Sequence, residues 1–335
     1  MPEFRDILVI DLLGGLGDLV MVLPVVHALA RRHPDAALRV LTHGPGDALL
    51  RHDPAVTEVR TAEKGRERAA VVTELDRRRP DLVVSTTRYD GIPAEIEHRV
   101  PRSVTNLWRD PPPDEPVSRR YLRILAGEGL VDDEYWPPVI RLTADERARG
   151  AAVLAGHAPP GPPVVLVPGA GMAVKHWPHW PALAAALVRQ GTPALVVAGS
   201  PAPGPWAAEL AVPLPATDLR GLAAVFAAVA DRDGVVVGPD TGPVRVAAAA
   251  GARTVGLFGP TAAARYGVAE PAPPGRAPAV DLQGLPGCPH RRPTAITEQV
   301  CWWAATCPLS PAGPACMAAI GPDEVVRAVR GVAEV

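Results

Sequence analysis

The sequence contains very little lysine and asparagine, few aromatic residues, and no large excess of either charge. Lys64 and Lys175 are the lysines among 34 basic residues, Asn106 is the one asparagine, and aromatic residues make up 4% of the chain. This bias is typical of a GC-rich genome, and it makes each lysine conspicuous. The net charge of −2 gives no indication of a nucleic-acid-binding protein, so we expect no nucleic-acid partner.

Long apolar runs and the cysteine pattern of a secreted scaffold are also missing. The longest apolar stretch near the start, residues 19–30, is interrupted by Pro24 and His27 and is shorter than the roughly 18–20 residues that span a bilayer. Acidic residues near the N-terminus do not suit a signal peptide. All the cysteines lie between residues 288 and 316, whereas a disulfide scaffold distributes them through a smaller chain. We therefore expect a cytoplasmic protein with at most peripheral membrane contact.

The sequence does contain a repeated alternation of short apolar runs with helical stretches. The chain has 335 residues and is 47% hydrophobic, which is enough for about two domains with sizeable cores. The alternation predicts an α/β protein with two Rossmann-like, doubly wound parallel sheets. A Pro/Gly-rich stretch breaks both helix and strand patterns and predicts a linker. We predict an N-terminal domain over 1–155, the linker over 156–163, a C-terminal domain over 164–320 and a C-terminal helix over 321–335.

Ligands of such sheets bind beyond the carboxyl ends of the strands, so the loops after the strands are the candidate sites. The first loop contains Gly14, Gly15, Gly17 and Asp18. Its spacing does not match the GxGxxG fingerprint of a dinucleotide site. The glycines allow a ligand to approach the backbone. Asp18 falls at or near a helix N-terminus, where it is an N-cap, a catalytic carboxylate or both.

Two later loops suit an anion. Residues 168–178 contain Gly169, Gly171 and Lys175 before a helix that Pro178 is expected to open. A surface turn is the alternative, but a rare lysine beside glycines and a helix start favours phosphate. The third loop contains Asp240, Thr241, Gly242 and, within the first helical turn, Arg245. Capping explains the aspartate and threonine, whereas phosphate binding also explains the glycine.

No catalytic metal is expected. Asp231 and Asp233 form a DxD pattern that precedes a strand, so we predict an exposed turn there. The cysteines are separated by 12, 5 and 8 residues with no CxxC pair, which gives a zinc ribbon no support. A structural four-thiolate metal site, buried free thiols and a disulfide pair all remain open for Cys288, Cys301, Cys307 and Cys316.

Five segments, in this order, resemble glycosyltransferase family 9, the heptosyltransferases. They are residues 13–24, 168–178, 238–248 and 257–261 and the tail that runs from Cys307 to Ile320. The resemblance implies a GT-B fold, with two Rossmann-like domains facing a central cleft. It also implies inverting, metal-independent transfer of heptose from ADP-heptose to the inner core of lipopolysaccharide, with no cofactor required.

The resemblance also assigns roles to particular residues. It makes Asp18 the general base on the acceptor side, Lys175 the diphosphate lysine, and Asp240, Thr241 and Gly242 the donor loop. This chain has Arg245 where the family usually has histidine, which leaves the sugar and base of the donor open. An actinobacterial source, which the GC-rich bias suggests, lacks lipopolysaccharide, so a secondary metabolite such as an antibiotic is an alternative acceptor. A sugar-nucleotide epimerase of the same architecture and a non-catalytic sugar-nucleotide-binding protein are the alternative functions.

Overall fold

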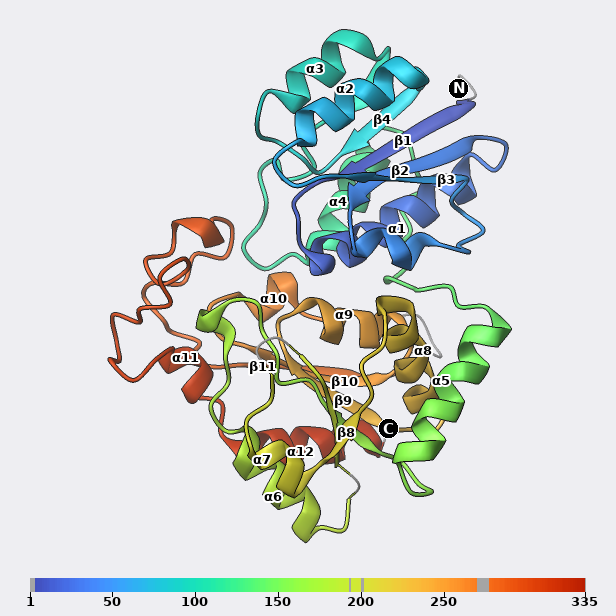
Figure 1. Cartoon of the computed structure of the whole chain (residues 1–335). Coiled ribbons are helices and arrows are strands. Elements are labelled where there is room, and N and C mark those ends of the chain that lie inside the picture. The colour runs from blue at the N-terminus through green and yellow to red at the C-terminus, as the bar shows by residue number, and fades with distance from the viewer. Residues whose placement is uncertain (1–3, 193, 200–201, 270–276, 335) are drawn as a thin grey trace. The chain divides into compact units, whose positions relative to one another are not determined.

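A computed structural model describes residues 4–192, 194–199, 202–269 and 277–334. The chain divides into two compact units: residues 1–111 with 117–141, and residues 112–116 with 142–335. Each unit is a parallel sheet with helices on both faces, as Figure 1 shows. The predicted α/β class with two doubly wound sheets is confirmed.

The first unit has the strand order β3-β2-β1-β4-β5. Helices α1 and α4 cover one face of this sheet, and α2 and α3 cover the other (Figure 1). Its elements are β1 (Asp6–Asp11), α1 (Leu16–Arg32), β2 (Ala37–His43), β3 (Glu58–Ala62), α2 (Glu67–Arg77), β4 (Leu82–Ser85), α3 (Ile92–Arg99), β5 (Arg102–Val104) and α4 (Val117–Gly127).

Strand β1 is the central strand of this sheet, and every one of its residues is buried. Ile7 pairs with Leu38 of β2 on one side and with Leu82 of β4 on the other. The chain moves outward from β1 through β2 to β3 and then returns to the other side of β1 with β4. The loops after β1 and β4 therefore meet at the point where the strand order reverses, which is the usual ligand position in such sheets.

The apolar run at residues 19–30 forms the buried part of α1, with Pro24 inside the helix. Its residues pack against the first sheet and α4, which accounts for the hydrophobicity without a bilayer. In the part of the chain that the structure describes, no helix has the length and apolar character needed to cross a membrane.

The second unit has the strand order β11-β10-β9-β6-β7-β8, with its reversal between β6 and β9. Its strands are β6 (Val164–Leu166), β7 (Ala194–Val197), β8 (Val212–Leu214), β9 (Val235–Pro239), β10 (Arg253–Phe258) and β11 (Ala279–Gln283). Its helices are α5 (Ala144–His157), α6 (Trp180–Arg189), α7 (Trp206–Leu210), α8 (Leu219–Ala230), α9 (Gly242–Ala249), α10 (Ala263–Tyr266), α11 (Ala315–Ala318) and α12 (Pro322–Ala333).

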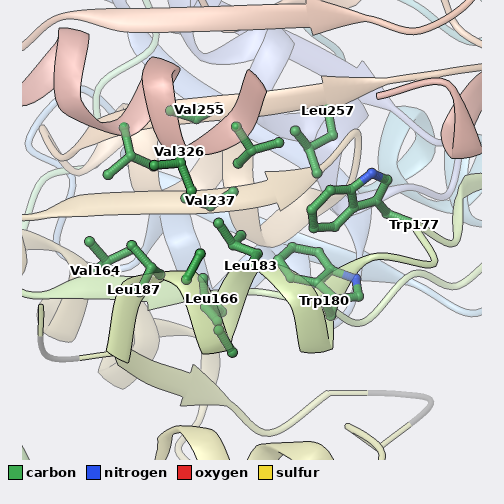
Figure 2. Close-up of a cluster of buried hydrophobic side chains, with 14 of the residues drawn as sticks. Val164, Leu166, Trp177, Trp180, Leu183, Leu187, Val237, Val255, Leu257 and Val326 are labelled. Carbon is green, nitrogen blue, oxygen red and sulfur yellow. The ribbon is translucent and has the colours of Figure 1, made fainter. Parts of the chain in front are cut away.

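The core on one face of the second sheet lies between the strands and helices α6 and α12 (Figure 2). Trp177 and Trp180 meet edge to face there, with ring centroids 4.9 Å apart, an arrangement that aromatic pairs favour. The Trp177 Nε1–H donates to Ile320 O at 2.9 Å. Because Trp177 lies in the loop between β6 and α6, this core anchors one of the candidate binding loops.

The boundary between the units differs from the prediction. Helix α5, assigned from the sequence to domain 1–155, belongs to the second unit. It packs closely on α8, because a Cβ at Gly150 would lie 2.2 Å from Ala224 O. Its buried Glu146 also accepts a hydrogen bond from Arg220 Nη2 at 2.6 Å. The stretch 156–163 therefore joins α5 to β6 inside one unit rather than joining two domains.

Candidate active site

The loop after β6 places Lys175 at the end of a short 3₁₀ helix, η2 (Ala173–Lys175). The loop is fixed on both sides of the lysine: His176 Nε2 bonds to Ala170 O at 2.9 Å, and Trp177 is anchored in the core. Helix α6 begins at Trp180, with Pro181 near its start. The expectation that Pro178 opens this helix is therefore wrong, because residues 176–179 complete the anchored loop first.

Packing does not require a glycine at position 171 of this loop. Gly169 is half-buried and Gly171 is exposed. A Cβ at Gly171 would meet no atom within 4 Å in the described structure. The loop thus has room beside its backbone.

The loop after β9 leads directly into α9. Thr241 is the N-cap residue by position, but its side chain makes no capping bond and donates to Pro239 O at 3.2 Å. Gly242 is the first helical residue. The side chain of Asp240 does not cap the helix either, because cations hold it. Capping therefore does not explain Asp240 or Thr241.

Asp240 is the centre of a buried ion cluster. Lys175 Nζ donates to Asp240 Oδ2 at 2.8 Å and to Asp240 O at 2.9 Å. Arg245 Nη2 donates to Asp240 Oδ1 at 2.6 Å and also to Tyr266 O. Thr261 Oγ1 donates to Asp240 Oδ2 at 2.8 Å. The structure thus brings together three predicted site residues, Lys175, Asp240 and Arg245, and adds Thr261 to them.

The surroundings of Asp240 fix its charge. Asp240 is 5% exposed, and burial alone would raise its pKa. The charges of Lys175 and Arg245, with hydrogen bonds from Lys175 and Thr261, outweigh burial and hold the pKa of Asp240 well below its ordinary value. Asp240 is therefore ionised at neutral pH, and its two cationic partners exceed it by one positive charge.

This cluster lies where the loops after β6 and β9 meet, at the reversal point of the second sheet. Helix α9 begins in the same loop, so its first N–H groups add partial positive charge. A surplus cation, a helix N-terminus and a glycine-containing loop are the features that bind a phosphate or diphosphate.

In the first unit, the loop after β1 carries Asp18 into the first turn of α1. The N-cap residue is Gly15, and Asp18 is the third helical residue, so the alternative that Asp18 is an N-cap is wrong. A Cβ at Gly15 would lie 2.3 Å from Asp18 Oδ2, so a larger residue there would displace the carboxylate from this position. Gly14 has a φ of +91°, a conformation that favours glycine. Gly17, in the first helical turn, completes the predicted loop.

Asp11, at the end of β1, is a second carboxyl group beside this loop. It is 2% exposed, and its Oδ1 accepts a hydrogen bond from Thr86 Oγ1 at 2.6 Å. Burial, together with the negative charge of Asp18, raises the pKa of Asp11 to about 7, although the Thr86 hydrogen bond acts against this rise. The loops after β1 and β4 therefore place a buried acid within the electrostatic influence of Asp18.

Sequence reasoning did not assign Asp11, Thr86 or Thr261 to a site. Thr86 directly follows β4, which lies next to β1. Its position could have identified it from the sequence, because ligands bind beyond the carboxyl ends of such strands. Thr261 lies in one of the segments that resemble the family. Asp281 was also missed: burial raises its pKa to about 6, although the Ala269 and Val268 N–H groups and the charge of Arg245 oppose the rise. A side chain in the edge strand β11 gave no such signal.

The four cysteines come together beside Val174, on the wall of one small cavity that also includes His290. Burial raises the pKa of Cys301, and the neighbouring Cys288 and Cys307 thiols raise it further. Burial also raises the pKa of Cys316, to about 11, so the Cys301 and Cys316 thiols are protonated at neutral pH and are not activated as nucleophiles. Among the described residues, however, no three Cys, His, Asp or Glu side chains are arranged as a metal-binding group.

The DxD pattern forms an exposed turn, as predicted. The side chains of Asp231 and Asp233 are 67% and 76% exposed, and Arg232 between them donates to Gly161 O. The turn precedes β9, at the end of the sheet opposite the ion cluster.

Comparison with known proteins agrees with this architecture. A family profile, glycosyltransferase family 9 (heptosyltransferase), matches residues 102–275, just over half of the chain. The match includes Lys175 and the Asp240 loop but neither Asp18 nor the cysteines. No curated protein sequence matches the chain.

Solved structures resemble the chain over nearly its whole length. A family 9 glycosyltransferase from Veillonella parvula superimposes with a TM-score of 0.75 at 16% identity, covering 98% of this chain and 97% of that one. ADP-heptose lps heptosyltransferase II of E. coli gives 0.70 at 18%, covering 98% and 99%. The iron-containing dodecameric glycosyltransferase TibC of enterotoxigenic E. coli gives 0.64 at 14%, covering 100% and 77%.

These likenesses agree with the GT-B fold predicted from the sequence. Together with the family profile over the ion-cluster loops, they support a glycosyltransferase that uses a nucleotide sugar. The chain belongs to glycosyltransferase family 9.

Proposed function

We propose that the protein transfers heptose, or a related sugar, from a nucleoside-diphosphate sugar to a hydroxyl of a sugar-containing acceptor, with inversion at the anomeric carbon. The observation that carries this proposal is the Lys175–Asp240–Arg245 cluster at the reversal point of the second sheet. It provides a surplus positive charge beside a helix N-terminus, in a chain of this family.

The donor diphosphate binds to the second unit in this proposal. Lys175 and the first N–H groups of α9 contact the phosphate oxygens, and Gly169, Gly171 and Gly242 leave room for them. Arg245 is 6% exposed and committed to Asp240 and Tyr266. We therefore assign Arg245 to holding Asp240, and through it Lys175, rather than to direct contact with the donor.

Asp18 is the general base in this proposal. The acceptor hydroxyl oxygen forms a bond to the anomeric carbon of the donor while the bond between that carbon and the phosphate oxygen breaks. The hydroxyl proton passes to the Asp18 carboxylate, and the nucleoside diphosphate leaves with the bonding electrons. Attack from the face opposite the leaving group inverts the anomeric centre. Asp11 is not assigned this role, because burial and the charge of Asp18 raise its pKa to about 7 and leave it partly protonated at neutral pH.

The transfer needs no metal in this proposal. The leaving diphosphate gains negative charge as the bond breaks, and Lys175 with the α9 N-terminus supplies the positive charge that a divalent cation supplies in other transferases. ADP is the first nucleotide to test, because one structural neighbour is described as an ADP-heptose heptosyltransferase.

We assign the cysteine cluster a structural role. Four thiols are a donor set that suits zinc or iron, and TibC is described as iron-containing, but the thiols as they lie here form no three-ligand group. Elemental analysis of the purified protein should show either near-stoichiometric metal or none. Cys301→Ser should leave donor binding and turnover at the parental level, and a large loss of turnover in a stable variant would show that the cluster takes part in the reaction.

The acceptor is either the lipopolysaccharide core or a secondary metabolite, and we favour neither from the geometry. The deciding experiment incubates the protein with ADP-heptose, GDP-heptose and GDP-hexoses, each with and without candidate acceptors, and measures nucleoside diphosphate release. A transferase releases nucleoside diphosphate with a glycosylated acceptor. An epimerase forms an isomeric sugar nucleotide without one, and a binding protein gives neither. A thermal-shift screen of nucleotides comes first, because a ligand bound only by the native state raises the melting temperature.

A further inference from the structure

Trp302 belongs to the cysteine-containing segment, yet its ring lies against the lysine of the ion cluster. The Lys175 Nζ is 5.3 Å from the centroid of the Trp302 ring. Trp302 is 6% exposed, and the Lys175 side chain is 16% exposed. The contact is therefore mostly shielded from water, which strengthens the attraction between a cation and an aromatic face.

We propose that Trp302 is a positioning residue for the donor: its indole ring holds the Lys175 ammonium in place for the donor diphosphate. The inference rests on the proposed function in one respect, namely that Lys175 contacts the diphosphate. It adds a role for the segment around Trp302, which the transfer chemistry otherwise leaves unused.

The directions around the ammonium support this role. A lysine has three N–H donors, and Lys175 gives two of them to Asp240, at 2.8 and 2.9 Å. The ring of Trp302 covers a further side of the ammonium. We assign the third N–H to a phosphate oxygen. A flexible side chain held on two sides loses less conformational freedom when the donor binds.

An aromatic ring suits this task better than a second carboxylate would. A carboxylate would neutralise the ammonium and compete with phosphate for its N–H groups. The ring attracts the cation through its quadrupole and accepts no conventional hydrogen bond from it. Arg245 already balances part of the Asp240 charge at 2.6 Å, so the cluster keeps a positive charge for the donor.

The segment around Trp302 is fixed to the second unit. The backbone N–H of Trp302 donates to Gln299 O at 3.0 Å. Gln299 is 3% exposed, and its side-chain Oε1 accepts a hydrogen bond from the backbone N–H of Arg292 at 2.9 Å. The Arg291 Nη2 donates to Gly259 O and Gly284 O, each at 2.7 Å. The ring is therefore part of a built contact and not of a free loop.

Trp303 is a matched control in the same segment. It is 75% exposed, and its Nε1–H donates to Thr297 O at 3.1 Å. It differs from Trp302 in exposure and in its partner, which is Thr297 instead of Lys175. The residue type is the same, and the two positions are adjacent in the chain.

The experiment measures ADP binding to the full-length protein by calorimetry. Trp302→Leu should weaken ADP binding by about 2- to 30-fold, the range for a cation–π contact from exposed to desolvated. Trp302→Phe, which keeps an aromatic face, should recover most of the affinity, and Trp303→Leu should bind ADP as the parent does. Melting temperatures establish that each variant is folded.

Two further measurements separate positioning from general packing. In a Lys175→Ala background, Trp302→Leu should cause no additional loss of ADP affinity, because the cation that the ring holds is gone. ADP should change the tryptophan fluorescence of the parent and of Trp303→Phe, and this change should be largely absent in Trp302→Phe. The fluorescence comparison still decides if Trp302→Leu fails to fold.

The outcomes distinguish this inference from the proposed function. If Lys175→Ala weakens ADP binding but Trp302→Leu does not, or if the Trp302→Leu loss is equally large without the lysine, the positioning role is wrong and the donor site stands. If Lys175→Ala itself binds ADP as the parent does, both fail.

Discussion

Asp11 and Asp240 occupy comparable places in the two units but have opposite electrostatic surroundings. Each is a buried aspartate at the carboxyl end of a strand that flanks the reversal point of its sheet. Asp11 has a hydroxyl and a second carboxyl group as neighbours, so burial and the charge of Asp18 raise its pKa to about 7. Asp240 has Lys175 and Arg245, whose charges overcome burial and hold its pKa far below the ordinary value.

The difference shows how one sheet topology provides two kinds of chemistry. The first unit gathers carboxyl groups at its strand ends, which suits proton transfer. The second unit gathers cations around one carboxylate, which suits a bound anion. In both, the chemistry depends on which side chains the neighbouring loop contributes: Thr86 after β4, and Lys175 after β6. Each prediction below changes one member of this comparison.

The largest effect is expected from Asp18→Asn. Asparagine keeps the shape of the side chain but cannot accept the acceptor's proton, so turnover should fall by about 10²–10⁴-fold. Donor affinity should change little, because the diphosphate binds to the cations of the other unit. The measurement is nucleoside diphosphate release at saturating donor, with the melting temperature as the control for folding. Near-parental turnover in a folded variant would show that the base lies elsewhere.

Lys175→Ala should have the next largest effect and should act on the other unit alone. Loss of a charged hydrogen bond to the diphosphate should weaken donor binding by about 1.5–3 kcal/mol, which is roughly 10- to 150-fold in Kd. Calorimetric titration with ADP tests this directly. The variant also leaves Asp240 with one cation, Arg245, so the pKa of Asp240 should rise toward its ordinary value. An unchanged ADP affinity would contradict the assignment of Lys175 to the donor.

The comparison also shows which features the sequence could predict. The alternation of apolar runs and the glycine-containing loops located the strand ends, and with them Asp18, Lys175 and Asp240. Contacts between distant residues were not predictable: Lys175 and Asp240 are 65 positions apart, and no local pattern shows that they pair. Helix α5 carries its own capping box at Thr143, which predicts where the helix begins but not the sheet on which it packs. The role of Trp302 depends on the same kind of long-range contact.

Asp11→Asn should have the smallest effect on the transfer reaction, and its expected effect appears in the pH dependence of stability. The pKa of Asp11 is about 7 in the folded protein, against an ordinary value of 3.8. Between these two pH values the folded state binds more protons than the unfolded state, so this residue's contribution to stability falls as the pH rises from about 4 to 7 and is then constant. One proton changes stability by at most about 1.4 kcal/mol per pH unit.

Asparagine does not titrate but still accepts the Thr86 hydrogen bond. The free energy of unfolding of the parent relative to Asp11→Asn should therefore decrease between pH 5 and pH 7 and level off above pH 8. Denaturant unfolding of both proteins over this range measures the difference, and taking the difference cancels residues such as Asp240, whose lowered pKa acts at more acidic pH and with the opposite sign. A difference that does not vary with pH would mean that Asp11 is ionised throughout, and the two buried aspartates would then be alike in charge.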